Sequence, residues 1–141
     1  MASLTSCVGN PRFIFATLIS TAWFLQCPET RQERTDRALT SLSRSIVNLV
    51  GIVAVSRPKE FAAAENDSAA FALAVRDVGS GVTLDDRARA HASKLQDAWG
   101  RALILKFEKG SRAIISCGPN GRFEGGKRDD IVFEIDVKLE D

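Results

Sequence analysis

The stretch from Ser116 to Ile131, SCGPNGRFEGGKRDDI, constrains the fold more than any other part of the chain. It holds four of the ten glycines, a Pro-Asn-Gly turn and an Asp-Asp pair. Glycine and asparagine adopt positive φ angles at low cost, so this composition predicts a tightly turned loop. Oxygens of Asn120, Asp129 and Asp130 fall within the same short arc, and oxygen ligands are what calcium requires. The sequence therefore predicts a calcium-binding loop, with a glycine-rich hairpin that only shapes turns as the alternative.

Three short segments after Gly100 show the two-residue alternation of half-buried strands. Apolar residues alternate in 103–107, and residues 112–117 return after a predicted hairpin turn at 108–111. The clearest alternation follows the loop, in residues 131–139. This order predicts a small antiparallel sheet at the C-terminal end, with one face on the core.

The helical half begins at a predicted capping box, in which Thr30 and Glu33 form the pattern T-x-x-E. Apolar residues then recur at spacings of three and four, and arginines fall mostly on the other side. The predicted apolar face comprises Leu39, Leu42, Ile46, Leu49 and Val53. We expect this long helix to run to about Val55 and to end before Pro58.

Shorter helices are predicted between the long helix and the sheet. An alanine-rich stretch starts at Pro58 and closes at Gly79, and the polar residues 66–68 are expected to interrupt it. Thr83 is the predicted N-cap of a further short helix. The apolar face of that helix is expected to carry Leu84, Ala88, His91 and Leu95. An N-terminal apolar segment and a long helix, then short helices and a small antiparallel C-terminal sheet, together give the α+β class.

The segment of residues 13–25, FIFATLISTAWFL, carries no charge. It is shorter than the roughly 20 residues that a helix needs to cross a bilayer, and it matches the apolar core of a secretory signal. We expect residues 1–27 to form an export signal or short membrane anchor and residues 28–141 to form the folded domain. A buried helix in a soluble protein is the alternative for this segment.

Composition narrows the possible functions. The formal net charge is only +1, so no overall field favours nucleic acid as a partner. The three cysteines are too scattered for a zinc site, and the sequence places no partner beside the single histidine. Asp129 and Asp130 are the remaining candidates for an acid/base pair, but neighbours in an extended chain point to opposite faces. We therefore expect a protein that is not an enzyme.

Two motifs occur in a fixed order in the C-terminal half. Residues 97–101 read DAWGR, and residues 116–121 read SCGPNG and open the loop that ends in the DDI of residues 129–131. The first resembles the Asp-Pro-Trp-Gly-Arg turn of the major pseudopilins of type II secretion systems, the general secretion pathway protein G-like family. The second is similar to Ser-Leu-Gly-Pro-Asp-Gly…Asp-Asp-Ile of the same family. The resemblance covers residues 95–137.

The resemblance implies a structural pseudopilin-like subunit of a type II secretion or type IV pilus-related assembly. Its expected partners are other pseudopilin-like subunits, the secretion machinery and the inner membrane. The N-terminal segment would anchor it in that membrane or export it to the periplasm. The resemblance also implies that the backbone carbonyl of Cys117 joins Asn120, Asp129 and Asp130 as a calcium ligand.

The N-terminus departs from the family pattern at the processing site. Phe15 and Ala16 stand where the family has Gly-Phe, and Ser20 stands where it has glutamate. A second hypothesis follows from this departure. The chain would be a stand-alone periplasmic or membrane-anchored binding module, stabilised by calcium, that does not polymerise.

Overall fold

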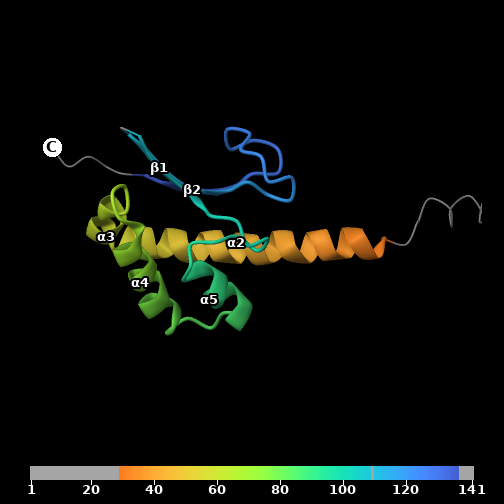
Figure 1. The fold of residues 1–141 in the computed structure, drawn as a ribbon, viewed down its shortest axis with the longest axis horizontal. Coiled ribbons are helices and arrows are strands. Elements are labelled where there is room, and N and C mark those ends of the chain that lie inside the picture. The colour runs from red at the N-terminus through yellow and green to blue at the C-terminus, as the bar shows by residue number, and fades with distance from the viewer. Residues whose placement is uncertain (1–28, 109, 137–141) are drawn as a thin grey trace, which may run out of the picture. The chain divides into compact units, whose positions relative to one another are not determined.

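The computed structural model describes residues 29–108 and 110–136. Within these residues the helices come first and an antiparallel sheet follows, which confirms the predicted α+β class (Figure 1). The predicted signal or anchor segment, residues 1–27, lies outside the described residues. So do residues 137–139 of the last predicted strand.

The long helix α2 (Arg31–Ser56) starts at the predicted capping box. The backbone N–H of Thr30 donates to Glu33 Oε2 at 2.7 Å, and the N–H of Glu33 donates to Thr30 Oγ1 at 3.2 Å. These reciprocal bonds satisfy backbone donors that the first helical turn leaves free. The chain divides in this first turn, and a second compact unit begins at Arg34.

One face of α2 forms the centre of the core of the second unit. Ile46 and Val53 of the predicted apolar face are fully buried, and Leu49 is 2% exposed. Leu39 and Leu42 are partly buried and pack against the same core. The predicted face of the long helix is therefore confirmed.

The same helix has a second property that bears on localisation. Among the described residues, α2 alone has the length and apolar composition of a membrane-spanning helix. In the most apolar stretch of 18 residues within this helix, 44% is buried inside the protein. Core helices of soluble proteins and signal sequences near the N-terminus share this length and composition. An apolar N-terminal helix is thus present, and it fits an anchor and a core helix alike.

Helices α3 (Pro58–Ala63) and α4 (Ser68–Gly79) follow directly. The proline lies in the first turn of α3, where its missing N–H costs nothing. The predicted interruption of the alanine-rich stretch is confirmed. Asp67 caps α4 there, because its Oδ1 accepts the backbone N–H of Ala69 at 2.9 Å.

The last helix, α5 (Asp86–Ala92), is capped by Asp85 and not by the predicted Thr83. Asp85 Oδ1 accepts the backbone N–H two residues further on at 3.0 Å, because it directly precedes the helix and its carboxylate reaches the first turn. The predicted helix was also too long. Leu84 precedes it and Leu95, with a φ of 51°, follows it, although both pack against the core.

The sheet contains β1 (Ile104–Glu108), β2 (Ser111–Ser116) and β3 (Ile131–Ile135) in the order β1-β2-β3, with both pairs antiparallel. The three predicted strands are thus present, and the loop of residues 117–130 joins β2 to β3. Figure 1 shows α2 running between the sheet on one side and the helices α4 and α5 on the other.

Aromatic side chains fix the sheet against the helices. The ring of Phe61 lies 5.2 Å from that of Phe71 and 4.9 Å from that of Phe107, measured between centroids. On β3, the ring of Phe133 packs where α2 carries Gly51, and a methyl group at that position would lie within 2.6 Å of its Cε1. The strand that follows the β2–β3 loop, β3, is therefore packed closely on α2.

Candidate functional site

The turn that precedes the sheet, residues 97–101, is built on a buried carboxylate. Asp97 is 1% exposed, and its Oδ1 accepts the backbone N–H groups of Trp99 at 3.0 Å and Arg101 at 2.9 Å. Gly100 has a φ of 77°, which lets the chain reverse. Residues 97–101 thus form an Asx turn.

A group of buried polar side chains joins this turn to α2 and to the loop. Ser116 Oγ donates to Asp97 Oδ2 at 3.1 Å, and Ser43 Oγ donates to Ser116 Oγ at 3.2 Å. The backbone N–H of Gly118 also donates to Ser116 Oγ, at 3.4 Å. Arg101 Nε lies 3.4 Å from Asp97 Oδ2 in an ion pair. The hydrogen bonds among Asp97, Ser116 and Ser43 hold a single arrangement and so fix the start of the loop, whereas Arg101 Nε is buried without a hydrogen bond among the described residues and contributes only the ion pair.

The loop of residues 117–130 closes on itself through Asn120 and Asp129. Asn120 Nδ2 donates to Asp129 Oδ1 at 2.9 Å, and the backbone N–H of Asn120 donates to Asp129 Oδ2 at 3.3 Å. The amide oxygen of Asn120 accepts the backbone N–H of Arg122 at 2.7 Å. Two of the predicted calcium ligands are therefore in direct contact.

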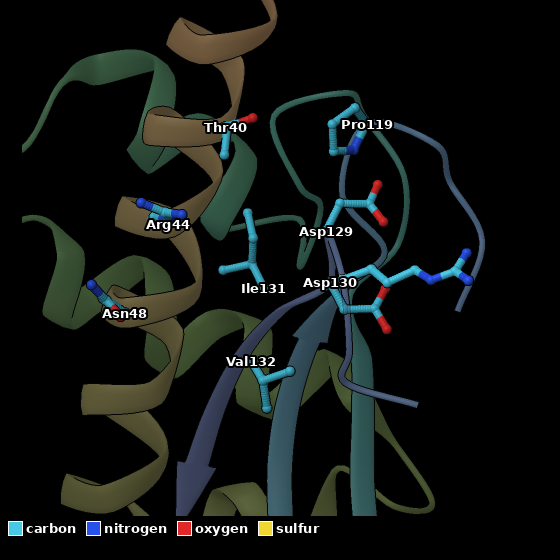
Figure 2. A pocket seen from close by; sticks show the side chains of 9 residues that line it. Thr40, Arg44, Asn48, Pro119, Asp129, Asp130, Ile131 and Val132 are labelled. Atoms are coloured by element: carbon cyan, nitrogen blue, oxygen red, sulfur yellow. The ribbon is translucent and has the colours of Figure 1, made fainter. Parts of the chain in front are cut away.

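Asp130 organises the second half of the loop. Its Oδ2 accepts the backbone N–H groups of Glu124 at 2.8 Å and Gly126 at 2.9 Å. Its Oδ1 is buried and has no hydrogen-bond partner among the described residues. Figure 2 shows the carboxylates of Asp129 and Asp130 on the same side of the chain. The chain is not extended here as the expectation of opposite faces assumed, because residues 128–129 form a turn that the backbone N–H of Asp130 closes by donating to the carbonyl of Lys127 at 3.2 Å.

Glu124 is a loop carboxylate that the predicted ligand set omits. Its Oε1 accepts from Arg128 Nη1 at 3.2 Å, whereas its Oε2 is buried without a partner in the described part of the chain. Burial raises the pKa of Glu124 above its ordinary value, and the neighbouring Asp129 carboxyl raises it further. Both effects disfavour the ionised form, which a bound cation would favour. Glu124 could have been found from the sequence, because it is a third carboxylate in a loop that already contains the Asp129-Asp130 pair.

Cys117 begins the loop, and its thiol is free and half-buried. Burial raises the pKa of this thiol, the Asp130 carboxylate raises it further and the Arg101 guanidinium lowers it. The predicted ligands therefore share one neighbourhood. Within residues 29–108 and 110–136, however, no three side chains of His, Cys, Asp or Glu are close enough together to form a ready metal site. The loop carries the donors without a preformed cage.

A hollow of about 460 Å³ lies between α2 and the loop (Figure 2). Thr40, Arg44 and Asn48 line it on α2, and Asp129 and Asp130 line it across from the helix. Arg44 lies on the exposed side of α2, as predicted for the arginines of the long helix. The hollow keeps this side of the loop open to solvent.

We compared the chain with known protein families, curated proteins and solved structures, and found no relative. The chain matches no protein-family model, and neither a curated protein nor a solved structure is significantly similar to it.

Proposed function

We propose that the chain is a structural, pseudopilin-like subunit of a type II secretion or type IV pilus-related assembly, with a calcium-binding C-terminal loop. One observation carries the proposal. The two motifs that resemble the family meet in space, because buried Asp97 of the first accepts a hydrogen bond from Ser116 of the second, 19 residues away. A long helix followed by short helices and a small antiparallel sheet is the architecture expected for such a subunit.

The donors in the loop fit calcium. Asp129, Asp130, Asn120 and the Cys117 carbonyl are the proposed ligands, and the position of Glu124 adds a further carboxylate. The buried Oδ1 of Asp130 and Oε2 of Glu124 have no hydrogen-bond partner among the described residues, so each has capacity for a cation. All these donors are oxygens, as a hard cation requires. When bound, calcium would neutralise the carboxylates and cross-link the two halves of the loop.

Calcium binding is tested by thermal melts of the full chain in calcium, in magnesium and in a chelator. A ligand that binds only the folded state at 100 times its Kd stabilises it by about 2.7 kcal/mol. We expect calcium to raise the melting temperature and Asp130→Ala to abolish the rise. Glu134→Ala removes an exposed carboxylate of β3 outside the loop and should retain it. Identical wild-type melts in calcium and chelator would show that the loop only shapes a turn.

The assembly role needs its own experiment. In the proposal, residues 1–27 hold the protein in the inner membrane or export it, and the helices and sheet lie in the periplasm. Expression of the full chain in a bacterium with a type II secretion system should place it in the inner-membrane fraction. Cross-linking there should yield ladders of copies or adducts with other pseudopilin-like subunits.

The alternative proposal is a binding module that does not polymerise. It is favoured by Phe15, Ala16 and Ser20, which replace the residues of the family's processing site. A monomer that melts higher in calcium but gives no cross-linked ladder would support this alternative. A protein that stays in the cytosol would contradict both proposals.

A further inference from the structure

The side chain of Arg101 reaches from the turn of residues 97–101 to Gly118 in the loop, 17 residues further along the sequence. At one end, its Nε forms the ion pair with the buried carboxylate of Asp97. At the other end, its Nη2 donates a hydrogen bond to the backbone carbonyl of Gly118, in the first turn of the loop. We infer that Arg101 is a positioning residue, which sets the conformation of loop residues 118–121.

The first turn of the loop is shaped around this guanidinium. Gly121 has a φ of 68°, and a methyl group added to it would overlap Arg101 Nη1 and lie 3.2 Å from Arg101 Cζ. Gly118 has a φ of 60°, and a methyl group there would lie 2.8 Å from the carbonyl carbon of Asp129. The two glycines therefore let the backbone approach Arg101 on one side and Asp129 on the other.

The guanidinium is itself held in place by the turn that carries it. Its Cζ lies 5.1 Å from the ring centroid of Trp99, close enough for a cation–π contact. The side chain of Arg101 is 34% exposed and that of Asp97 is 1% exposed, so the ion pair is largely shielded from water. A planar guanidinium can keep Nε in an ion pair with Asp97 while Nη2 donates to Gly118, whereas a lysine ammonium is a single point that cannot reach both.

The consequence concerns the proposed ligands. Asn120 lies between the two glycines that Arg101 contacts, and it is the residue that bonds Asp129 across the loop. If Arg101 sets residues 118–121, it also sets the position of Asn120. The effect of Arg101 on the order of the loop does not depend on the proposed function. An effect of Arg101 on calcium affinity does depend on it, because it requires that the loop binds calcium.

Arg101→Lys and its control Arg122→Lys test the inference. Arg122 is an exposed arginine of the same loop, so the control makes the same change without touching the guanidinium site. Amide hydrogen exchange without calcium is measured for residues 118–121, in which Gly118, Asn120 and Gly121 carry a backbone N–H, and for β2. We expect Arg101→Lys to accelerate exchange in residues 118–121 at least tenfold and to leave β2 unchanged, whereas Arg122→Lys changes neither.

A second pair of variants keeps Arg101 and alters the space beside it. Gly121 and Gly125 have similar φ angles of 68° and 74°, so alanine strains the backbone comparably at both. Only at Gly121 does the added methyl meet Arg101, because nothing lies within 4 Å at Gly125. We expect Gly121→Ala to accelerate exchange more than Gly125→Ala, and the difference to vanish when Arg101 is also changed to alanine.

Calcium titrations of the same variants measure the effect of Arg101 on calcium affinity. We expect Arg101→Lys to bind calcium about tenfold more weakly than wild type. If wild type binds no calcium, the proposed function fails, and hydrogen exchange still decides the role of Arg101. Exchange in residues 118–121 that equals wild type in Arg101→Lys would overturn the inference. So would an acceleration that is equal in the loop and in β2, since that result would mean a general loss of stability.

Discussion

Gly51 lies inside α2, where alanine normally stabilises a helix, and Gly51→Ala is nevertheless expected to destabilise this protein. Replacing glycine by alanine within a helix gains about 1 kcal/mol, because alanine loses less backbone entropy on folding. At Gly51, however, the new methyl would overlap the ring of Phe133 and lie within 2.6 Å of its Cε1. Real Cβ atoms do not approach a ring this closely, so α2 and β3 must move apart.

The expected magnitude follows from the two opposing effects. Overpacking a well-filled site costs about 1–3 kcal/mol, and this cost is expected to exceed the gain in helix propensity. We predict a net loss of about 1 kcal/mol in the free energy of unfolding, measured by urea denaturation. The control is Gly79→Ala in α4, where the nearest atom to the new methyl is Leu49 Cδ2 at 3.5 Å, an ordinary contact. Gly79→Ala should be neutral or stabilising.

A double-mutant cycle assigns the loss to the ring. In the Phe133→Ala background the ring is absent, and Gly51→Ala should then stabilise the protein as alanine does in other helices. A coupling energy of about 1–3 kcal/mol is expected between the two positions. If Gly51→Ala is as stable as wild type, or is equally harmful with and without the ring, the ring of Phe133 does not pack against Gly51 in the folded protein.

Three further predictions concern other parts of the molecule. Ile46→Ala should cost about 2–5 kcal/mol in urea denaturation because Ile46 is fully buried, whereas Arg44→Ala on the exposed side of the same helix should change stability little. Asp97→Asn should cost about 3 kcal/mol, because it breaks a buried ion pair and places an amide N–H₂ against donors; an unchanged urea midpoint would contradict the network. For Glu124, a pKa raised in the folded state means that the folded chain binds the proton more tightly than the unfolded chain. Calcium-free stability should therefore fall as the pH rises from about 4.5 through the folded-state pKa, and Glu124→Gln should remove this part of the slope in melts across pH.

The helical half was predictable where its signals are local. Thr30 and Glu33 form their capping box, and the polar break at Asp67 becomes the cap of α4. The N-terminus of α5 was not predicted, because Thr83 and Asp85 are both good capping residues only two positions apart. The capping preferences of threonine and aspartate are too similar to separate the two positions. The tertiary structure decides which side chain lies beside the first turn of α5, and that residue is Asp85.

The candidate site was predictable only in part. Asn120 and Asp129 were expected to lie in one short arc because loop composition is a local property, and the structure brings the two side chains into a direct hydrogen bond that was not predicted. The shared direction of Asp129 and Asp130 was not foreseen, because the turn at residues 128–129 includes Arg128 with a positive φ, which is uncommon for a residue other than glycine. Ser43 was missed altogether. Its hydrogen bond to a strand 73 residues away exists only once the helix and sheet are packed.

The network around Asp97 explains why a turn motif and a loop motif that are distant in the sequence act together. A buried carboxylate is costly unless its oxygens are satisfied, and Asp97 has two backbone N–H groups, the Ser116 hydroxyl and the Arg101 guanidinium as partners. Apolar residues could fill the same space with comparable stability, but they would not direct Arg101 to Gly118. The network thus contributes a specific loop conformation more than it contributes stability. A chain that kept its helices and sheet but lost Ser116 would retain the fold and lose the hydrogen bonds that define the start of the loop, from which the proposed calcium ligands follow.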